Sequence, residues 1–313
     1  MKLILTGSIA IDRIMSYDGR YADVIQPDKL HVLSLSVLLS QMRETRGGVA
    51  ANIAYTLALL GEKPLLYGSV GQNGLEYMDS LKDMGIDTSK VHFSILPTAA
   101  FNVITDKANC QVGGFYPGAM SDAKSLRIEP FKNDTVFVVI SPHDPAQMAF
   151  QVKECKKLKK RMCYDIGQQA SNVSGKDIQA GIEACELLIV NDYEMGVLTE
   201  KTGWSQEKIV AMVKTVVVTL GEKGSLVWSE GRRHSVSALK VKKVVDPTGA
   251  GDAFRSGFLY GYIQDVDPVI CAKLGATAAA FAVEVQGTQA HHFTKTQFRT
   301  RYQKQFGSLS ILE

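Results

Sequence analysis

The stretch VVDPTGAGDAFRSGFLYGY, residues 244–262, carries the strongest indication of the fold. Two valines end an extended segment, Asp246-Pro247-Thr248 turns the chain, and Gly249-Ala250-Gly251-Asp252 begins a helix. Small residues in a tight turn let main-chain N–H groups point outward together, and a helix start adds partial positive charge. The stretch therefore predicts an anion site. An aspartate beside a transferring phosphoryl group can accept the proton of the attacking hydroxyl while the N–H groups stabilise negative charge.

Two simpler interpretations of this stretch remain open from the residues alone. One is a glycine-rich helix start with an aspartate cap, and the other is a dinucleotide-binding turn, which normally lies in the first strand–helix unit. The longer string DPTGAGDAF, from Asp246 to Phe254, resembles the signature of the ribokinase-like (PfkB) family of carbohydrate and nucleoside kinases. The resemblance implies that Asp252 is the catalytic base and that Gly249, Ala250 and Gly251 form the anion hole.

Polar residues near the N-terminus lie where an open sheet places ligands. Asp12 follows a strand predicted at residues 2–6, and RGGVAAN, residues 46–52, begins a helix with apolar residues at helical spacing. A capping aspartate and a packing asparagine are the ordinary alternatives. The spacing GGxxxN resembles the first signature of the same family, and a carboxylate can accept from two vicinal hydroxyls. The resemblance implies that the acceptor is bound by Asp12, Gly47, Gly48 and Asn52.

Two strings follow later strands. Asn191-Asp192-Tyr193-Glu194 matches the NxxE pattern of the family, and residues 219–224 match its TxGxxG phosphate loop. Taken alone, they would be a helix start and a strand–turn–strand. Magnesium keeps most of its waters and needs few protein ligands. The resemblance implies ATP and Mg²⁺, with Asn191 and Glu194 holding the metal's waters and nearby phosphate. Residues implied to contact the nucleotide are Asn191, Thr219, Gly221, Gly224 and Gly251.

The resemblance adds two further expectations. Asp246 and Thr248 stand where some relatives bind a monovalent cation. Lid strands in the family sometimes pair between subunits, so a homodimer through the lid is expected.

The adjacent histidines at positions 291 and 292 have no further metal-ligating residue at a useful spacing, and we expect both at the surface.

The fold expected is α/β. From residue 135 onward, short β-branched runs alternate with helical segments, which predicts a parallel sheet with helices on both faces. Residues 14–45 and 91–120 lack this rhythm, and the second range contains a hairpin, residues 101–116. We expect one ribokinase-like three-layer α/β/α unit, residues 1–313, with a mainly parallel central sheet, a β lid made of the two irregular ranges, and a nucleotide-binding part at 135–313. Aromatic residues that either close over a bound ring or only fill the lid core are Phe101, Phe115 and Tyr116.

Composition excludes several classes of protein. The chain has 313 residues, 45% hydrophobic residues and a formal charge of +3. Its one basic run, residues 156–161, is expected on a solvated helix end, so nucleic acid is not implied. No run approaches the ~18 apolar residues of a membrane span, and no signal peptide is suggested. Five scattered cysteines without metal-ligand spacing indicate reduced thiols in the cytoplasm.

The predicted activity is ATP-dependent phosphorylation of a ribonucleoside 5′-hydroxyl, with adenosine or another purine nucleoside preferred. Within the family, residues 8–36 and the NDYE string look most like prokaryotic nucleoside kinases. A kinase acting on ribose, fructose or a related sugar is the alternative. A nucleotide-binding sensor would be expected to lack Asp252, and a dinucleotide-dependent dehydrogenase would need an early GxGxxG, which residues 1–70 do not contain.

Overall fold

The core of the molecule is an eight-stranded sheet in the order β14-β13-β12-β11-β10-β9-β1-β4. Its six strands from β12 to β4 are parallel, and β13 and β14 add an antiparallel edge. The strands in chain order are β1 (Lys2–Thr6), β4 (Leu65–Tyr67), β9 (Val136–Ile140), β10 (Arg161–Tyr164), β11 (Leu187–Asn191), β12 (Thr215–Thr219), β13 (Ser225–Ser229) and β14 (Arg232–Val236). The parallel sheet is confirmed. Its strands are unbroken apolar runs because both faces are buried.

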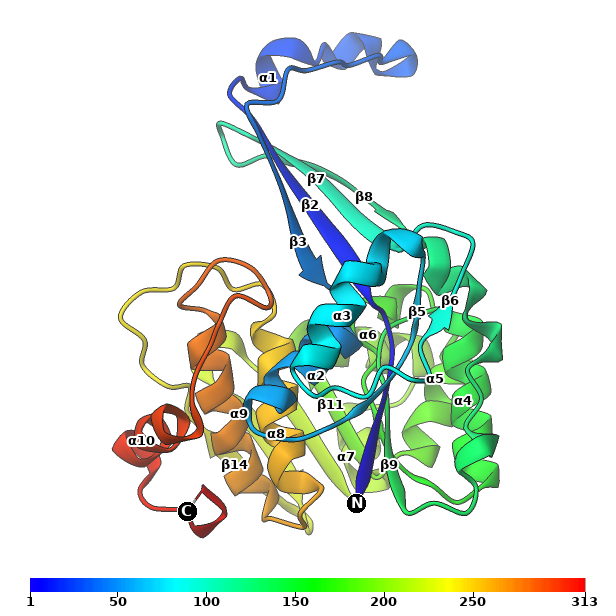
Figure 1. Ribbon diagram of the computed structural model, residues 1–313, viewed down its shortest axis with the longest axis vertical. Helices are drawn as coiled ribbons and strands as arrows, with labels where there is room; N and C mark the ends of the chain where they lie inside the picture. Colours follow the sequence, from blue (N-terminus) through cyan, green and yellow to red (C-terminus); the bar gives the residue numbers. More distant parts are fainter. Residues whose placement is uncertain (313) are drawn as a thin grey trace.

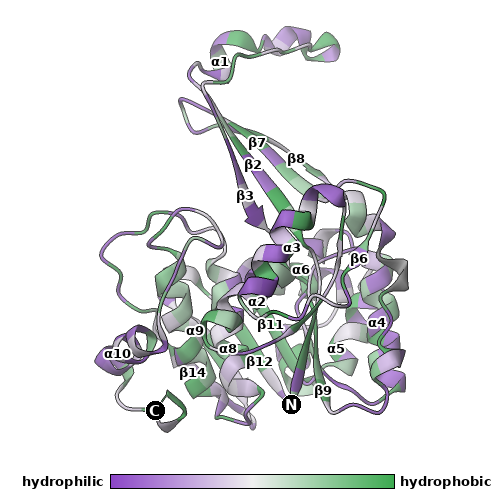
Figure 2. Cartoon of the chain, viewed as in Figure 1, coloured by the Kyte–Doolittle hydropathy of each residue, from purple (hydrophilic) through white to green (hydrophobic). Residues whose placement is uncertain are grey.

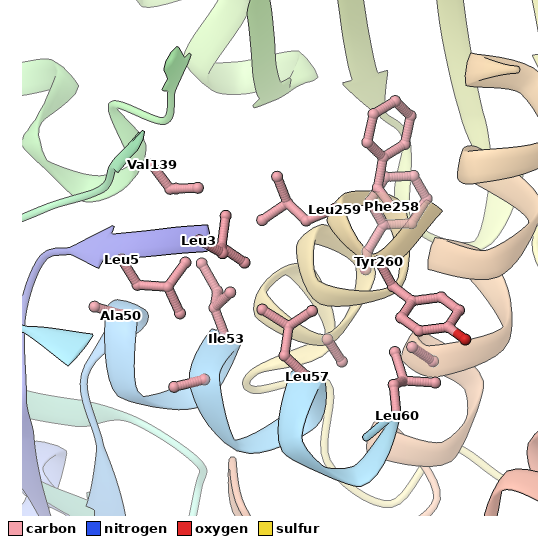
Figure 3. Packing of buried hydrophobic residues seen from close by; sticks show 14 of the residues in the cluster. Leu3, Leu5, Ala50, Ile53, Leu57, Leu60, Val139, Phe258, Leu259 and Tyr260 are labelled. Carbon is pink, nitrogen blue, oxygen red and sulfur yellow. The ribbon is translucent and has the colours of Figure 1, made fainter. Parts of the chain in front are cut away.

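Two helical layers cover the sheet (Figure 1). Helices on one face are α2 (Val49–Leu59), α3 (Leu75–Asp83), α8 (Ala250–Tyr262), α9 (Pro268–Ala282) and α10 (Lys295–Phe306). Those on the other are α4 (Pro145–Lys157), α5 (Gly175–Ala184), α6 (Asp192–Thr202) and α7 (Gln206–Met212). Successive side chains of a strand point to opposite faces of the sheet, so each strand contributes to two separate apolar cores. Leu3 and Leu5 of β1 pack with Ile53, Leu57 and Phe258 in the first layer (Figure 3), whereas Ile4 packs in the second.

A second sheet of four strands forms the lid, in the order β3-β2-β7-β8. Its strands are β2 (Ala10–Tyr17), β3 (Gln41–Gly47), β7 (Ala99–Asp106) and β8 (Gln111–Tyr116). The expected hairpin at residues 101–116 is confirmed as β7 and β8. Asp106 accepts hydrogen bonds from the N–H groups of Ala108 and Cys110, both at 2.8 Å, which explains the tight turn between these strands. The lid extends from the body and has α1 (Tyr21–Val24) at its far end (Figure 1).

The computed structural model describes residues 1–312, apart from the side chains of residues 123–125. The remaining elements are the strands β5 (Ser69–Val70) and β6 (His92–Phe93) and the 3-10 turns η1 (Pro27–Val32), η2 (Gln72–Gly74), η3 (Gly118–Ser125), η4 (Glu129–Phe131), η5 (Gly167–Ser171), η6 (Gly221–Lys223) and η7 (Ser310–Leu312). Hydrophobic colouring concentrates on the large sheet and on the helix faces that pack against it (Figure 2). Among residues 1–312, no helix combines the length and apolar character that crossing a membrane requires.

Candidate active site

A cavity of about 600 Å³ lies at the carboxyl ends of the parallel strands, below the lid. Ligands bind at this end of open α/β sheets. Nine residues singled out from the sequence line it: Asp12, Gly48, Asn52, Phe101, Phe115, Thr248, Gly249, Gly251 and Asp252. Segments from both ends of the chain therefore meet around one hollow. A larger hollow of about 1170 Å³ lies at the amino ends of the strands, where Lys214 and Glu207 give it mixed charge, and no predicted residue lines it.

The residues predicted to bind the acceptor lie where β3 passes into α2 and on the neighbouring strand β2. Gly48 has a φ of +92°, and a Cβ there would lie 2.6 Å from the main-chain nitrogen of Ala10, so a side chain is excluded. A Cβ on Gly47 would lie 2.4 Å from Oδ2 of Asp12. Gly47 therefore leaves room for the Asp12 carboxylate. Burial, with a smaller contribution from the negative charge of Asp252, raises the pKa of Asp12 to about 6.

Helix α8 places the predicted base. Gly249, with a φ of +79°, is its N-cap, and Asp252 lies in its first turn. The N–H of Ala250 donates to the carbonyl of Pro247 at 3.2 Å. The next N–H groups, those of Gly251 and Asp252, have no carbonyl one turn earlier inside the helix, as at any helix start. The N–H groups of Gly251 and Asp252 are therefore donors suited to an anion, whereas Ala250, which belongs to the predicted anion hole Gly249–Gly251, has its N–H already engaged by main chain.

Two side chains, one from α2 and one from α8, contact the Asp252 carboxylate. Its Oδ2 accepts a hydrogen bond of 2.8 Å from Nδ2 of Asn52, and its Oδ1 lies 4.0 Å from the Arg255 guanidinium. Burial raises the pKa of Asp252, while Arg255 and the Asn52 amide oppose that rise. Arg255 also contacts Asp165 at 2.7 Å and Glu194 at 3.7 Å. One buried cation thus faces three carboxylates.

Sequence reasoning missed Arg255 and assigned no role to Asp165. Asp165 directly follows β10, and polar residues after parallel strands tend to line the site, which is a signal that could have identified it. The same signal applies to Gln168, Gln169 and Asn172, which follow β10 and line the cavity. Arg255 is one turn after Asp252 on α8, and its role depends on tertiary contacts.

The predicted metal residues lie at the start of α6. Asn191 Oδ1 accepts from the N–H of Glu194 at 2.7 Å, and Glu194 Oε2 accepts from the N–H of Asn191 at 2.8 Å, which is a capping box. Neither residue lines the 600 Å³ cavity. Within the described chain, no three His, Cys, Asp or Glu side chains are grouped to hold a metal ion. Glu194 is already engaged by main chain, so it suits the waters of a metal better than the metal itself.

The predicted phosphate loop lies at the same edge of the sheet but outside the cavity. Thr219 ends β12 in register with Asn191 on β11, and Gly221 and Gly224 bracket the turn that leads to β13. A hydrogen bond of 2.7 Å from the N–H of Leu220 to the carbonyl of Gly224 closes that turn. The residues predicted to bind the nucleotide and those predicted to bind the acceptor therefore share the carboxyl edge of the sheet.

Both carboxylate oxygens of Asp246 accept main-chain hydrogen bonds, from Thr248 at 2.9 Å and from Gly287 at 3.0 Å. Burial works against ionisation, but these hydrogen bonds outweigh it, and the pKa of Asp246 lies below its usual range. Asp246 therefore joins the turn before α8 to the loop after α9.

The lid contributes two of its three candidate aromatic residues to the cavity. Phe101 of β7 and Phe115 of β8 lie opposite each other in register and line it, with 39% and 48% of their surface exposed. Tyr116 does not line the cavity, because successive residues of a strand point to opposite faces. Of the two possibilities left open by the sequence, closing over a bound ring therefore suits Phe101 and Phe115 but not Tyr116.

The expectation of two surface histidines is wrong for His291. Its side chain is buried, its Nε2 lies 2.9 Å from Oγ1 of Thr56, and its carbonyl accepts from the hydroxyl of Tyr55. Burial lowers its pKa to about 4. His292 is exposed as expected. Two adjacent histidines in the sequence do not indicate that α2 packs against only one of them.

Comparison with known proteins places this geometry in a wider group. The model of the pfkB family of carbohydrate kinases matches residues 9–295. A nucleoside kinase of Methanocaldococcus jannaschii is 30% identical over 295 residues, 93% of each chain, and a cytidine kinase of Thermococcus kodakarensis is 28% identical over 89% of this chain and 95% of its own. The structure of a Burkholderia thailandensis nucleoside kinase in complex with inosine has a TM-score of 0.88 at 30% identity and covers 98% of this chain and 99% of its own. The similarity therefore includes both the large sheet and the lid.

Proposed function

Since the chain belongs to the pfkB family of carbohydrate kinases and is a phosphotransferase that acts on a hydroxyl group, we propose that its acceptor is the 5′-hydroxyl of a ribonucleoside. ATP is the proposed donor, and adenosine or another purine nucleoside is the favoured acceptor. The observation that carries this proposal is the single cavity lined by Asp12, Asn52 and Asp252 beside the start of α8.

The proposed roles follow from the contacts. Asp12 accepts hydrogen bonds from the vicinal ribose hydroxyls, and Asn52 donates to the acceptor. Asp252 takes the proton of the 5′-hydroxyl as its oxygen attacks the γ-phosphorus, and the bond to the leaving ADP oxygen breaks. The N–H groups of Gly251 and Asp252, with the α8 dipole, stabilise the charge that develops on the transferring group.

On the donor side, Thr219 and the turn from Gly221 to Gly224 would contact the nucleotide phosphates. Asn191 and Glu194 would hold waters of a magnesium ion, which supplies positive charge to the phosphates when bound. The capping box that joins these two residues supports an outer role of this kind, because it orients both side chains before any ligand arrives. A monovalent cation near Asp246 and Thr248 remains part of the proposal.

The nucleoside acceptor is supported by the shape of the cavity and by the relatives. A volume of about 600 Å³ lies within the range of small-molecule sites, roughly 300–1,000 Å³. Phe101 and Phe115 offer aromatic faces from the lid, which suit a planar base better than a free sugar. The relatives include enzymes named for nucleosides, and one structure was solved with inosine.

We also propose that the protein is cytoplasmic, because its five cysteines are all unpaired in the described chain.

A coupled assay of ADP release with purine nucleosides, pyrimidine nucleosides, ribose and fructose tests this proposal. We expect the highest kcat/KM with a purine nucleoside. Asp252→Asn should keep the fold and reduce kcat by about 10²- to 10⁴-fold, since it removes the base. Activity on free sugars alone would contradict the nucleoside assignment, and wild-type kcat in Asp252→Asn would contradict the base.

A further inference from the structure

A chain of hydrogen bonds lies behind the acceptor side of the cavity and ends on Asp252. The hydroxyl of Tyr77 donates to the carbonyl of Gly47 at 3.0 Å, and Nε2 of Gln289 contacts the Tyr77 oxygen. Nε2 of Gln289 also donates to Oδ1 of Asn52 at 2.9 Å. Finally, Nδ2 of Asn52 donates to Oδ2 of Asp252 at 2.8 Å. Three helices and the loop after α9 meet in this chain.

The direction of every bond in this chain is determined by its two ends. A main-chain carbonyl can only accept, so the Tyr77 hydroxyl donates to Gly47 and its oxygen accepts from Gln289. Burial raises the pKa of Tyr77 above its usual range, which keeps this hydroxyl protonated. The two hydrogens of the Gln289 amide are thereby both used. At the other end, the carboxylate of Asp252 accepts, so Asn52 must present its amide nitrogen there.

The reverse orientation of the Asn52 amide is strongly disfavoured. It would point Oδ1 at the Asp252 carboxylate and Nδ2 at the Gln289 amide nitrogen, so that two acceptors and two donors would face each other. Asn52 is buried, with 4% of its surface exposed, and water cannot readily compensate for such contacts. Gln289 therefore distinguishes the two orientations of Asn52.

The loop that carries Gln289 is held in place by hydrogen bonds of the residues on either side of it. The N–H of Gly287 donates to Asp246 at 3.0 Å, and the hydroxyl of Thr288 donates to the carbonyl of Arg46 at 2.7 Å. Two residues later, the carbonyl of His291 accepts from Tyr55 at 2.6 Å. The loop is thus tied to the turn before α8, to the base of the lid and to α2.

We propose that Gln289 is a positioning residue, which fixes the amide of Asn52 so that its nitrogen faces Asp252 and the acceptor. This proposal rests on the proposed function. Asn52 then offers the acceptor only a donor, and the hydroxyl protons must be accepted by Asp12 and Asp252. Without Gln289, the Asn52 amide can rotate and Asp252 loses a partner that favours its ionised form.

Gln289→Leu removes both donors at nearly constant volume. We expect kcat to fall on the order of 10- to 100-fold, with the KM for ATP unchanged, because misplaced reacting groups cost rates of this size. The acid limb of the pH profile of kcat should move to higher pH, since the carboxylate of Asp252 loses a hydrogen bond. A purely structural role would lower stability without this pH shift.

Gln179→Leu is the matched control. Gln179 lies on α5, on the other side of the large sheet, and its Nε2 donates to the carbonyl of Thr202 at 2.9 Å, so the change removes one amide far from the cavity. Its kcat and pH profile should equal those of the wild type. Should Gln289→Leu fail to fold, Gln289→Met, which keeps the unbranched side chain, gives the same readings.

The outcomes distinguish a failure of the positioning role of Gln289 from a failure of the proposed function. A wild-type protein that phosphorylates no nucleoside and no sugar removes the proposed function. An active wild type, together with a folded Gln289 variant of unchanged kcat and unchanged acid limb, removes the positioning role alone. A lower kcat with a shifted acid limb supports both.

Discussion

Two carboxylates in one cavity dominate the chemistry at the scale of the residue. Asp12 and Asp252 come from opposite ends of the chain, and burial raises the pKa of each, with Asp252 adding to the rise at Asp12. Mutual repulsion and desolvation favour protons at this site. Asp252 has Asn52 and Arg255 to oppose that tendency, whereas no such opposing contribution accompanies Asp12. The two groups are therefore expected to respond differently to pH.

Acceptor affinity should fall as pH decreases through about 6, because protonated Asp12 no longer accepts from two hydroxyls. In Asp252→Asn, the neighbouring negative charge is absent, so the pKa of Asp12 decreases and binding should persist to lower pH. Isothermal titration calorimetry with the preferred nucleoside, as a function of pH for both proteins, measures this shift. Affinities with the same pH midpoint in both proteins would contradict it.

Helix starts and strand ends do most of the positioning at the scale of the element. Helix α2 begins at Gly48, α6 at Asn191 and α8 at Gly249, and each N-cap belongs to a predicted motif. The α8 start and the α6 start are joined through Arg255, which contacts carboxylates on both and on the segment after β10. The buried ion cluster therefore connects the proposed base, Asp252, to the predicted metal residue Glu194.

Arg255→Leu should lower the free energy of unfolding by about 3–5 kcal/mol, since it leaves buried carboxylates without their cation. Urea denaturation measures the loss. The control is Arg301→Leu, which removes a bidentate pair with Glu284 that is closer to solvent and should cost about 1 kcal/mol or less. Equal losses in the two variants would show that the cluster does not hold α8.

Gly48→Ala should abolish acceptor binding and destabilise the start of α2, since its Cβ would overlap the main chain at Ala10. Gly85→Ala is the matched control. Gly85 has a similar φ of +84° but open space around it, so this variant should lose only about 1–2 kcal/mol from backbone strain and keep its activity. Thermal unfolding and calorimetry with nucleoside separate the two effects. Normal acceptor binding by Gly48→Ala would contradict the claim that the main chain at Ala10 leaves no room for a side chain at position 48.

The lid and the body form the site together at the scale of the whole molecule. β2 and β3 leave the body at the cavity and carry Asp12 and the approach to Gly47, while β7 and β8 carry Phe101 and Phe115 above it. Beyond the cavity, the far end of the lid exposes large apolar side chains: Leu30, Val32, Leu33 and Leu38 are 50–91% exposed. Such a surface favours contact with another chain.

We predict a homodimer through the lid, in which these four apolar side chains are covered. Leu33→Glu combined with Leu38→Glu should give monomers that remain folded, because neither residue is buried in its own chain. Light scattering after size exclusion measures the mass, and Ile95→Glu, which changes a fully exposed residue away from the lid tip, is the control. A wild-type protein with the mass of one chain at every concentration would contradict the dimer.

Much of this arrangement was predictable from local patterns. Apolar runs and helical spacing predicted the parallel sheet and its two helical layers, because strands that are buried on both faces are apolar along their length. The β7–β8 hairpin was predicted from two extended runs separated by a polar turn. The motifs around Gly48, Asn191 and Gly249 marked the three helix starts that face the carboxyl edge, since glycine and asparagine at these positions answer local backbone requirements.

Only the tertiary structure decided the contacts between segments that are far apart in the chain. Asn52 meets Asp252 across 200 positions, Gln289 meets Asn52 across 237, and Arg255 meets Asp165 across 90. His291 is buried for the same reason, because α2 packs against it. A hydrogen bond or ion pair depends on the distance between atoms after folding, and no local pattern encodes that distance. The sequence alone therefore determined which chemistry the chain can offer, and packing decided which partners orient it.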